Sequence, residues 1–81
     1  MWIEPKEMSH WAYWRCIDKG NKSEIRKYIT DSYWAYNYCK YIKDDPGVRK
    51  YITESYWAHL YCLKIKDRIE VRKNIKVEQC G

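Results

Sequence analysis

The sequence predicts an all-α fold: a small stack of short helix pairs, either solenoid-like or a compact helical bundle. The first observation is a repeat, since "IRKYITDSYWAYNYC" (25–39) and "VRKYITESYWAHLYC" (48–62) match at 11 of 15 positions, one 23-residue step apart. The second is the helical spacing of apolar and small residues within each copy. The third is the absence of a strand pattern. Tyr, Trp and Ile are common in strands, but the strict apolar–polar alternation of a half-buried strand is missing.

The 81 residues predict one domain, 1–81, because so short a chain has room for a single core. The 23-residue step extends backward to a degenerate copy around Trp11 and Cys16, and forward to "VRKNIK" (71–76). Repeats this short bury a core only by stacking on their neighbours. The predicted units cover approximately 2–20, 21–43 and 44–66, with a truncated unit over 67–81.

The first half of each unit predicts a short helix, with apolar residues at i, i+3 and i+4 from Ile25 and again from Val48. The segment "DDPG" separates two units. Pro46 fits the first turn of the helix that follows, with Asp44 or Asp45 as its N-cap. Such short helices need tertiary packing to be stable.

The second half of each unit predicts a longer helix with one buried stripe. Ala35, Cys39 and Ile42 lie at i, i+4 and i+7, and the next unit repeats this stripe from Ala58. N-cap candidates precede both helices. They are Thr30, Asp31 and Ser32 in one unit, and Thr53 and Ser55 in the next.

The composition favours binding to other macromolecules. The net charge is +5, and there are five Trp and nine Tyr but no Phe. Positive charge favours acidic partners such as nucleic acid or an acidic protein face, although a solvated Lys-rich surface explains it equally well. Because no run of 18 apolar residues occurs and the N-terminus has no apolar core of a signal peptide, we expect no membrane association and a cytoplasmic location.

The cysteines and histidines do not predict catalysis, a metal site or a cofactor. Cys16, Cys39 and Cys62 recur at one phase, so stacking places neighbouring ones about 8–10 Å apart, too far for a shared zinc ion or a disulfide. We expect them to be buried, and Cys80 to be an exposed thiol. His10 and His59 have no nucleophile or acid at a matched phase, and there is no glycine-rich phosphate loop, so we expect a non-enzyme.

Two surfaces remain as candidate sites. Paired basic residues at one phase predict a ladder of six positive charges along one side of the stack, unless the repeat has merely copied idle surface. Aromatic and apolar residues on the outer side of the longer helices predict a surface that either the segment Ile69 to Val77 or a partner covers. The ladder is Arg26, Lys27, Arg49, Lys50, Arg72 and Lys73; the partner-binding candidates are Tyr33, Tyr36, Lys40, Tyr56, His59, Leu60 and Leu63.

The repeated pattern S-x-W-A-Y/H-x-Y-C-x-x-I-K resembles short helical repeats of uncharacterised phage and bacterial proteins, over roughly residues 9–76. The chain departs from them in having Cys where Ala is common and no Trp after Ile-Lys. The resemblance implies no chemistry. It does imply a phage or its bacterial host as the source, and by analogy a small anti-defence inhibitor, such as an anti-CRISPR protein.

Three functions follow as hypotheses. The first is a non-enzymatic inhibitor that binds a host protein complex through its aromatic and basic surface. The second is a nucleic-acid or nucleotide binder that uses the ladder for phosphates and the aromatic residues for stacking. The third is a self-assembling repeat, such as a homodimer through Leu60 and Leu63.

Overall fold

The computed structural model describes residues 4–76, and within that range it contains six helices and no strand. The prediction of an all-α fold is confirmed. Long and short helices alternate along the chain. The long helices are α1 (Pro5–Lys19), α3 (Ser32–Tyr41) and α5 (Ser55–Lys64), and the short ones are α2 (Ser23–Arg26), α4 (Pro46–Arg49) and α6 (Ile69–Arg72).

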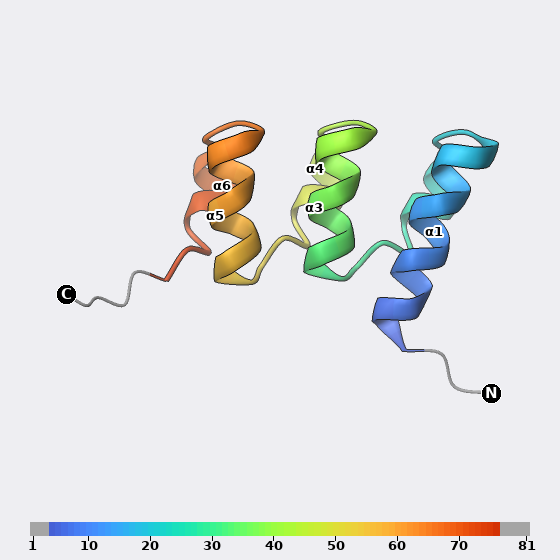
Figure 1. The fold of residues 1–81 in the computed structure, drawn as a ribbon, viewed down its shortest axis with the longest axis horizontal. Coiled ribbons are helices and arrows are strands. Elements are labelled where there is room, and N and C mark those ends of the chain that lie inside the picture. The colour runs from blue at the N-terminus through green and yellow to red at the C-terminus, as the bar shows by residue number, and fades with distance from the viewer. Residues whose placement is uncertain (1–3, 77–81) are drawn as a thin grey trace.

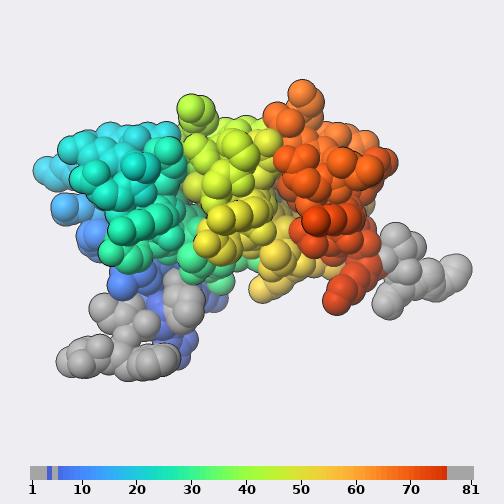
Figure 2. Space-filling model, turned by 180° about the vertical axis from the view of Figure 1, so that it is seen from behind, coloured from blue at the N-terminus to red at the C-terminus, as the bar shows by residue number. Residues whose placement is uncertain are grey.

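The helices form an open stack of two layers. Figure 1 shows α1, α3 and α5 side by side in one layer, with α3 in the middle, and the short helices behind them. The molecule measures 44 × 28 × 15 Å along its principal axes, as expected for a short solenoid. Seen from behind in Figure 2, the stack consists of three neighbouring blocks.

Each long helix packs against the short helix that follows it. The contacting pairs are α1 with α2, α3 with α4 and α5 with α6, while α3 also contacts both α1 and α5. The units predicted from the sequence pair the helices differently, as short then long. Consequently α6, predicted as part of a truncated unit, completes the third pair, and the described residues form three whole pairs.

Two of the predicted helix starts are correct in detail. The Asp31 carboxylate accepts hydrogen bonds from the backbone N–H groups of Tyr33 and Trp34 at the start of α3. Asp45 caps α4 by accepting one from Gly47. The candidates for α5 are wrong: its N-cap residue is Glu54, which makes no capping bond with its side chain.

The core is one continuous cluster that runs through the stack. Ala35 and Ala58 are fully buried, as the predicted stripe requires, and Cys39 is buried beside them. The short helices and their ends contribute Ile29, Ile52, Val48 and Val71. Small residues on the long helices allow close approach, while the branched residues fill the space between the two layers.

Two of the long helices each contain a buried serine that forms hydrogen bonds with the segment leading into the next long helix. The Ser9 hydroxyl donates to the Tyr28 carbonyl and accepts from the N–H groups of Thr30 and Asp31, at 2.9–3.2 Å. One repeat later, Ser32 makes the corresponding three bonds to residues 51, 53 and 54. These bonds satisfy partly buried backbone groups of the connecting chain.

No helix in the described range is long and apolar enough to cross a membrane.

Candidate interaction surface

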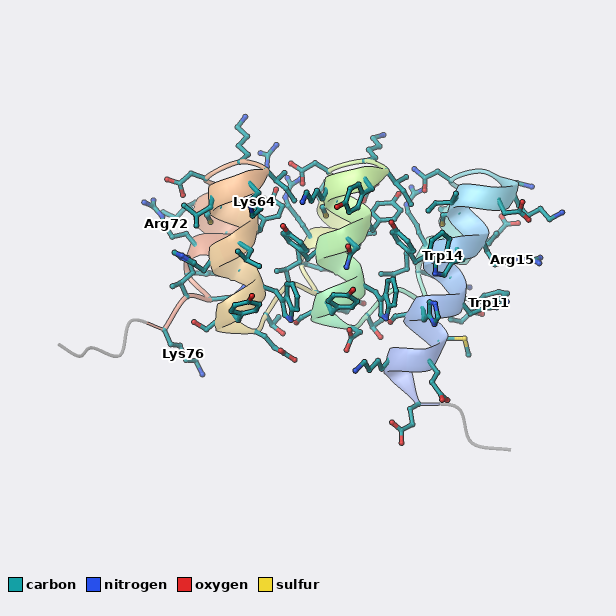
Figure 3. All side chains as sticks on the ribbon, in the orientation of Figure 1. Trp11, Trp14, Arg15, Lys64, Arg72 and Lys76 are labelled. Carbon is teal, nitrogen blue, oxygen red and sulfur yellow. The ribbon has the colours of Figure 1, made fainter. Side chains whose placement is uncertain are left out.

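Most of the exposed large apolar side chains lie on the outer side of the long helices. This side lies opposite the buried alanine stripe of each helix, and Figure 3 shows Trp14 on this side of α1. Its six large side chains are between 38% and 67% exposed. We call this surface the long-helix face: it comprises Trp14, Ile17, Tyr33, Tyr41, Tyr56 and Leu63.

Most of the partner-binding candidates lie on this face or beside it. Tyr33, Tyr56 and Leu63 belong to the face, and Lys40 is exposed within it, with its ammonium group 5.1 Å from the centre of the Tyr41 ring. His59 is also exposed, on the side of α5 that points away from α3. Whether these residues bind a partner stays a prediction.

Tyr36 does not belong to this surface. The prediction that it points outward is wrong, because only 5% of it is exposed. It lies on the side of α3 that faces α5, where its ring is 5.4 Å from that of Trp57. Leu60 is half-buried and packs against the core, so it adds little to the face.

The sequence analysis missed Trp14, Ile17 and Tyr41. For the residues of α1 the repeat itself held the signal, because Ile17 lies one 23-residue step before Lys40 and two steps before Leu63, whereas Tyr41 shares its phase with Asp18 and Lys64 and has no such signal. Two such steps also separate Trp14 from Leu60. Projecting the candidates back onto the degenerate first unit would have extended the predicted surface to α1.

The chain beyond α5 does not cover this face within the described residues. Val71 of α6 is buried against α5, in the layer of short helices behind the stack. Leu63 is still 67% exposed, so the fold-back over the outer side is not seen. Val77 of the proposed fold-back segment, like the thiol of Cys80, lies outside the described residues.

The arginines of the basic ladder are all paired with acids. Arg49 is buried, with its Nε atom 2.9 Å from Glu70 and its Nη1 atom 3.1 Å from Asp44. The other two make looser pairs at 3.5 Å, Arg26 with Asp45 and Arg72 with Asp67. Three of the six predicted positive charges are thus paired with acids within the chain, and whether the ladder binds a partner stays a prediction.

The three lysines of the ladder remain exposed. Lys27 and Lys50 each place the ammonium group over the ring of the next residue, 5.4 Å from Tyr28 and 5.3 Å from Tyr51. Lys73 is the third. This side of the stack thus presents one exposed lysine per repeat that is not paired with an acid among the described residues, where the sequence predicts two adjacent positive charges per repeat.

Asp44 is the centre of the most connected polar cluster. It accepts hydrogen bonds from the hydroxyl of Tyr61 at 2.6 Å, from Nε of Arg68 at 3.0 Å and from Arg49. Partial burial acts to raise the pKa of this carboxyl, but the three donors outweigh it and hold the pKa below its usual value. Burial and the same carboxylate raise the pKa of Tyr61. The cluster joins α5 to the preceding helix pair.

The described residues offer no group of three or more His, Cys, Asp or Glu side chains that could hold a metal ion. Cys16 and Cys39 are buried as free thiols, and Cys62 is partly buried. Burial raises the pKa of Cys39 to about 12, so this thiol is protonated at neutral pH and a poor nucleophile. The cysteines act as small apolar residues of the core.

The imidazole of His10 stacks on Trp34, with a distance of 4.5 Å between ring centroids and 9° between the planes. This places the ring at a contact between α1 and α3.

Comparison of the chain with protein-family models, with curated proteins and with solved structures finds no match.

Proposed function

We propose that this chain is a non-enzymatic protein-binding module, and that the long-helix face is its contact surface. The observation that carries the proposal is the clustering of six large apolar side chains, each at least 38% exposed, on one side of the long helices. Contiguous exposed apolar patches mark interaction sites on soluble domains. Tyr and Trp, which make up four of the six, are enriched among residues that dominate binding energy.

The charge around this face suggests the chemistry of the partner. Lys40 and Lys64 are exposed on α3 and α5, close to Tyr41 and Leu63 in the sequence. Several acids of the chain are already engaged with its own arginines. We therefore propose a protein partner with an apolar centre and an acidic rim, whose charge also speeds the encounter.

The resemblance of the repeat to phage and bacterial proteins supports a more specific version of this proposal. In that version the partner is a host protein complex, and the chain is a small inhibitor that acts in the cytoplasm of a bacterial host. A rigid stack is suited to blocking a surface, because its side chains lose little conformational freedom on binding.

Nucleic-acid binding is the alternative, and it has less support. Three of the six ladder charges are paired with acids, and the exposed lysines that remain are single. Phosphate contacts need free cations, and each neutralised phosphate adds to the salt dependence of binding.

The test is capture of partners from a lysate of the source cells, with and without nuclease. Bait variants carry either Leu63→Asp with Tyr41→Ser, within the face, or Lys27→Ser with Lys50→Ser, on the ladder. We expect a protein that survives nuclease, is lost with the first variant and is retained by the second. Binding that nuclease abolishes, or that only the ladder variant loses, would contradict the proposal and favour nucleic acid.

A further inference from the structure

The first helix pair leaves apolar side chains exposed at its outer end. Trp11 is 46% exposed and lines a groove of about 530 Å³ with Glu7, Met8 and Tyr28. Figure 3 shows Trp11 and Arg15 pointing away from α3, out of the end of the stack. Repeat proteins need terminal repeats with a polar outer face to stay soluble. Among the residues that the structure describes, this end carries no such cap.

Trp11 is the counterpart of the two tryptophans that join the helix pairs. Trp34 of α3 lies against α1, with ring distances of 4.5 Å to His10 and 5.1 Å to Tyr13. Trp57 of α5 lies at the corresponding position against α3, at 4.8 Å from Tyr33 and 5.4 Å from Tyr36, although it meets Tyr33 edge to face where Trp34 stacks on His10. Each junction thus inserts one Trp between two aromatic rings of the preceding pair.

At the opposite end of the stack, the corresponding aromatic slot holds no tryptophan within residues 4–76. Tyr56 and His59 occupy on α5 the positions that Tyr33 and Tyr36 occupy on α3, one repeat later. Both are exposed. The first junction already uses a histidine and a tyrosine for this slot, in His10 and Tyr13, so these residue types accept a Trp.

The charges at the two ends of the stack are also complementary. The junction between the second and third helix pairs serves as the template for which residues would meet if a second copy continued the stack. There Asp44 accepts from Tyr61 and Arg68, and Arg49 pairs with Glu70. One step further along the chain, the acceptor is Asp67 and the cation is Arg72.

The first helix pair supplies the opposite charges for these two residues. Arg15, Lys22 and Glu24 lie two 23-residue steps before Tyr61, Arg68 and Glu70 of the template, respectively. They therefore occupy the corresponding positions of the first helix pair. A second copy stacked in register would therefore place Arg15 and Lys22 against Asp67, and Glu24 against Arg72. Figure 3 shows Arg72 and Arg15 at opposite ends of the stack, where such pairing requires them.

We propose that a second copy of this chain docks on the end of the stack, with its α1 against α5 and its Trp11 between Tyr56 and His59. The contact continues the interface that already joins the helix pairs within the chain. It is heterologous, because different surfaces of the two copies meet, so both outer ends remain free to bind again. The chains then associate head to tail, and the long-helix face recurs along the assembly. This inference does not depend on what that face binds.

The test uses two variants that each block one end. Trp11→Asp removes the inserted ring, and Asp67→Arg places a cation against Arg15 and Lys22 of the next copy. Light scattering over a range of concentrations measures the mass. We expect the wild type to grow beyond a dimer, each variant alone to stay monomeric, and an equimolar mixture to form a dimer and nothing larger, because it retains one intact head and one intact tail.

A charge exchange tests the predicted pairing directly. Adding Arg15→Asp to Asp67→Arg should restore growth that Asp67→Arg alone has lost. Trp14→Asp is the control, since Trp14 lies on the long-helix face of the same helix, and this variant should assemble as the wild type does. Circular dichroism checks that every variant is folded. A wild type that is monomeric at all concentrations, or a mixture that forms no dimer, would overturn the proposal.

Discussion

At the scale of the residue, one residue type at one position of the repeat can be exposed to solvent to very different extents. Arg26, Arg49 and Arg72 recur at one phase and each binds an acid, but their side chains are 26%, 9% and 55% exposed. Solvent screens an exposed pair, whereas a buried charge without a partner is costly. The two ion pairs of Arg49 therefore stabilise the fold, and the single ion pair of Arg72 contributes little.

We expect Arg49→Ala to lower the free energy of unfolding by about 2–3 kcal/mol, because it removes charged hydrogen bonds from a buried position. Arg72→Ala, at the same phase, is the matched control and should cost less than about 1 kcal/mol. Urea unfolding of both variants measures the difference. Equal losses would show that burial does not distinguish the two sites.

The lowered pKa of Asp44 predicts a loss of stability in acid. Because the carboxyl binds its proton less readily in the folded chain than in the unfolded one, its contribution is complete above the usual value of 3.8 and is lost as the pH falls through the folded pKa. Urea midpoints measured from about pH 7 down to about pH 2 should fall less for Asp44→Asn than for the wild type. Asp18→Asn, at a side chain that is 71% exposed, is the control and should behave as the wild type.

At the scale of the element, the junctions between helix pairs combine one inserted Trp with one buried Ser. The Trp supplies apolar area between two rings, as Trp57 does between Tyr33 and Tyr36. The Ser holds the connecting chain at the right distance, as Ser32 does for Thr53 and Glu54. Short helices that are unstable alone thus gain their stability from these contacts.

Ser32→Ala should lower the free energy of unfolding by about 1–3 kcal/mol, because the N–H groups of Thr53 and Glu54 and the carbonyl of Tyr51 lose their partner. Hydrogen exchange of those two amides should become faster than in the wild type. Ser23→Ala, at an exposed position at the start of α2, is the control. Unchanged exchange at Thr53 and Glu54 would mean that the serine does not hold the junction.

At the scale of the whole molecule, the three helix pairs of the described range stack in a line, and among them the middle pair alone has a neighbour on both sides. In such an array the stability is approximately a sum over units and the interfaces between neighbours. A core built in this way is extended by each added unit, without any rearrangement of the others.

A second copy of residues 44–66, inserted after Lys66, should therefore raise the urea midpoint. The m-value should rise by about a quarter, in proportion to the added chain, because it follows the surface exposed on unfolding. The same residues inserted in scrambled order are the control and should lower the midpoint. If the chain with the additional unit is no more stable than the wild type, stability is not a sum over stacked units.

Much of the fold could be predicted because its signals are local. Helical spacing around Ala35 and Cys39 predicts the buried stripe, and short polar residues before the helices predict the caps at Asp31 and Asp45. The pairing of each long helix with the short helix after it could not be predicted. A long helix such as α3 has one short helix before it and one after it in the sequence, and either could pack against its buried side. The long-helix face was predicted in part: Tyr33, Tyr56 and Leu63 follow from the helical period, whereas Tyr36, which was expected to point outward, is buried.

The sequence by itself determined that the chain repeats, that it is helical and which stripe of each long helix is buried, because these depend on spacing within one element. Only the tertiary structure decided which sides of the helices have neighbours. Tyr36 and His59 share one phase of the repeat, yet Tyr36 is buried and His59 is exposed. The physical reason is that Trp57 of α5 packs on Tyr36, whereas no later helix in the described part of the chain supplies a tryptophan to His59.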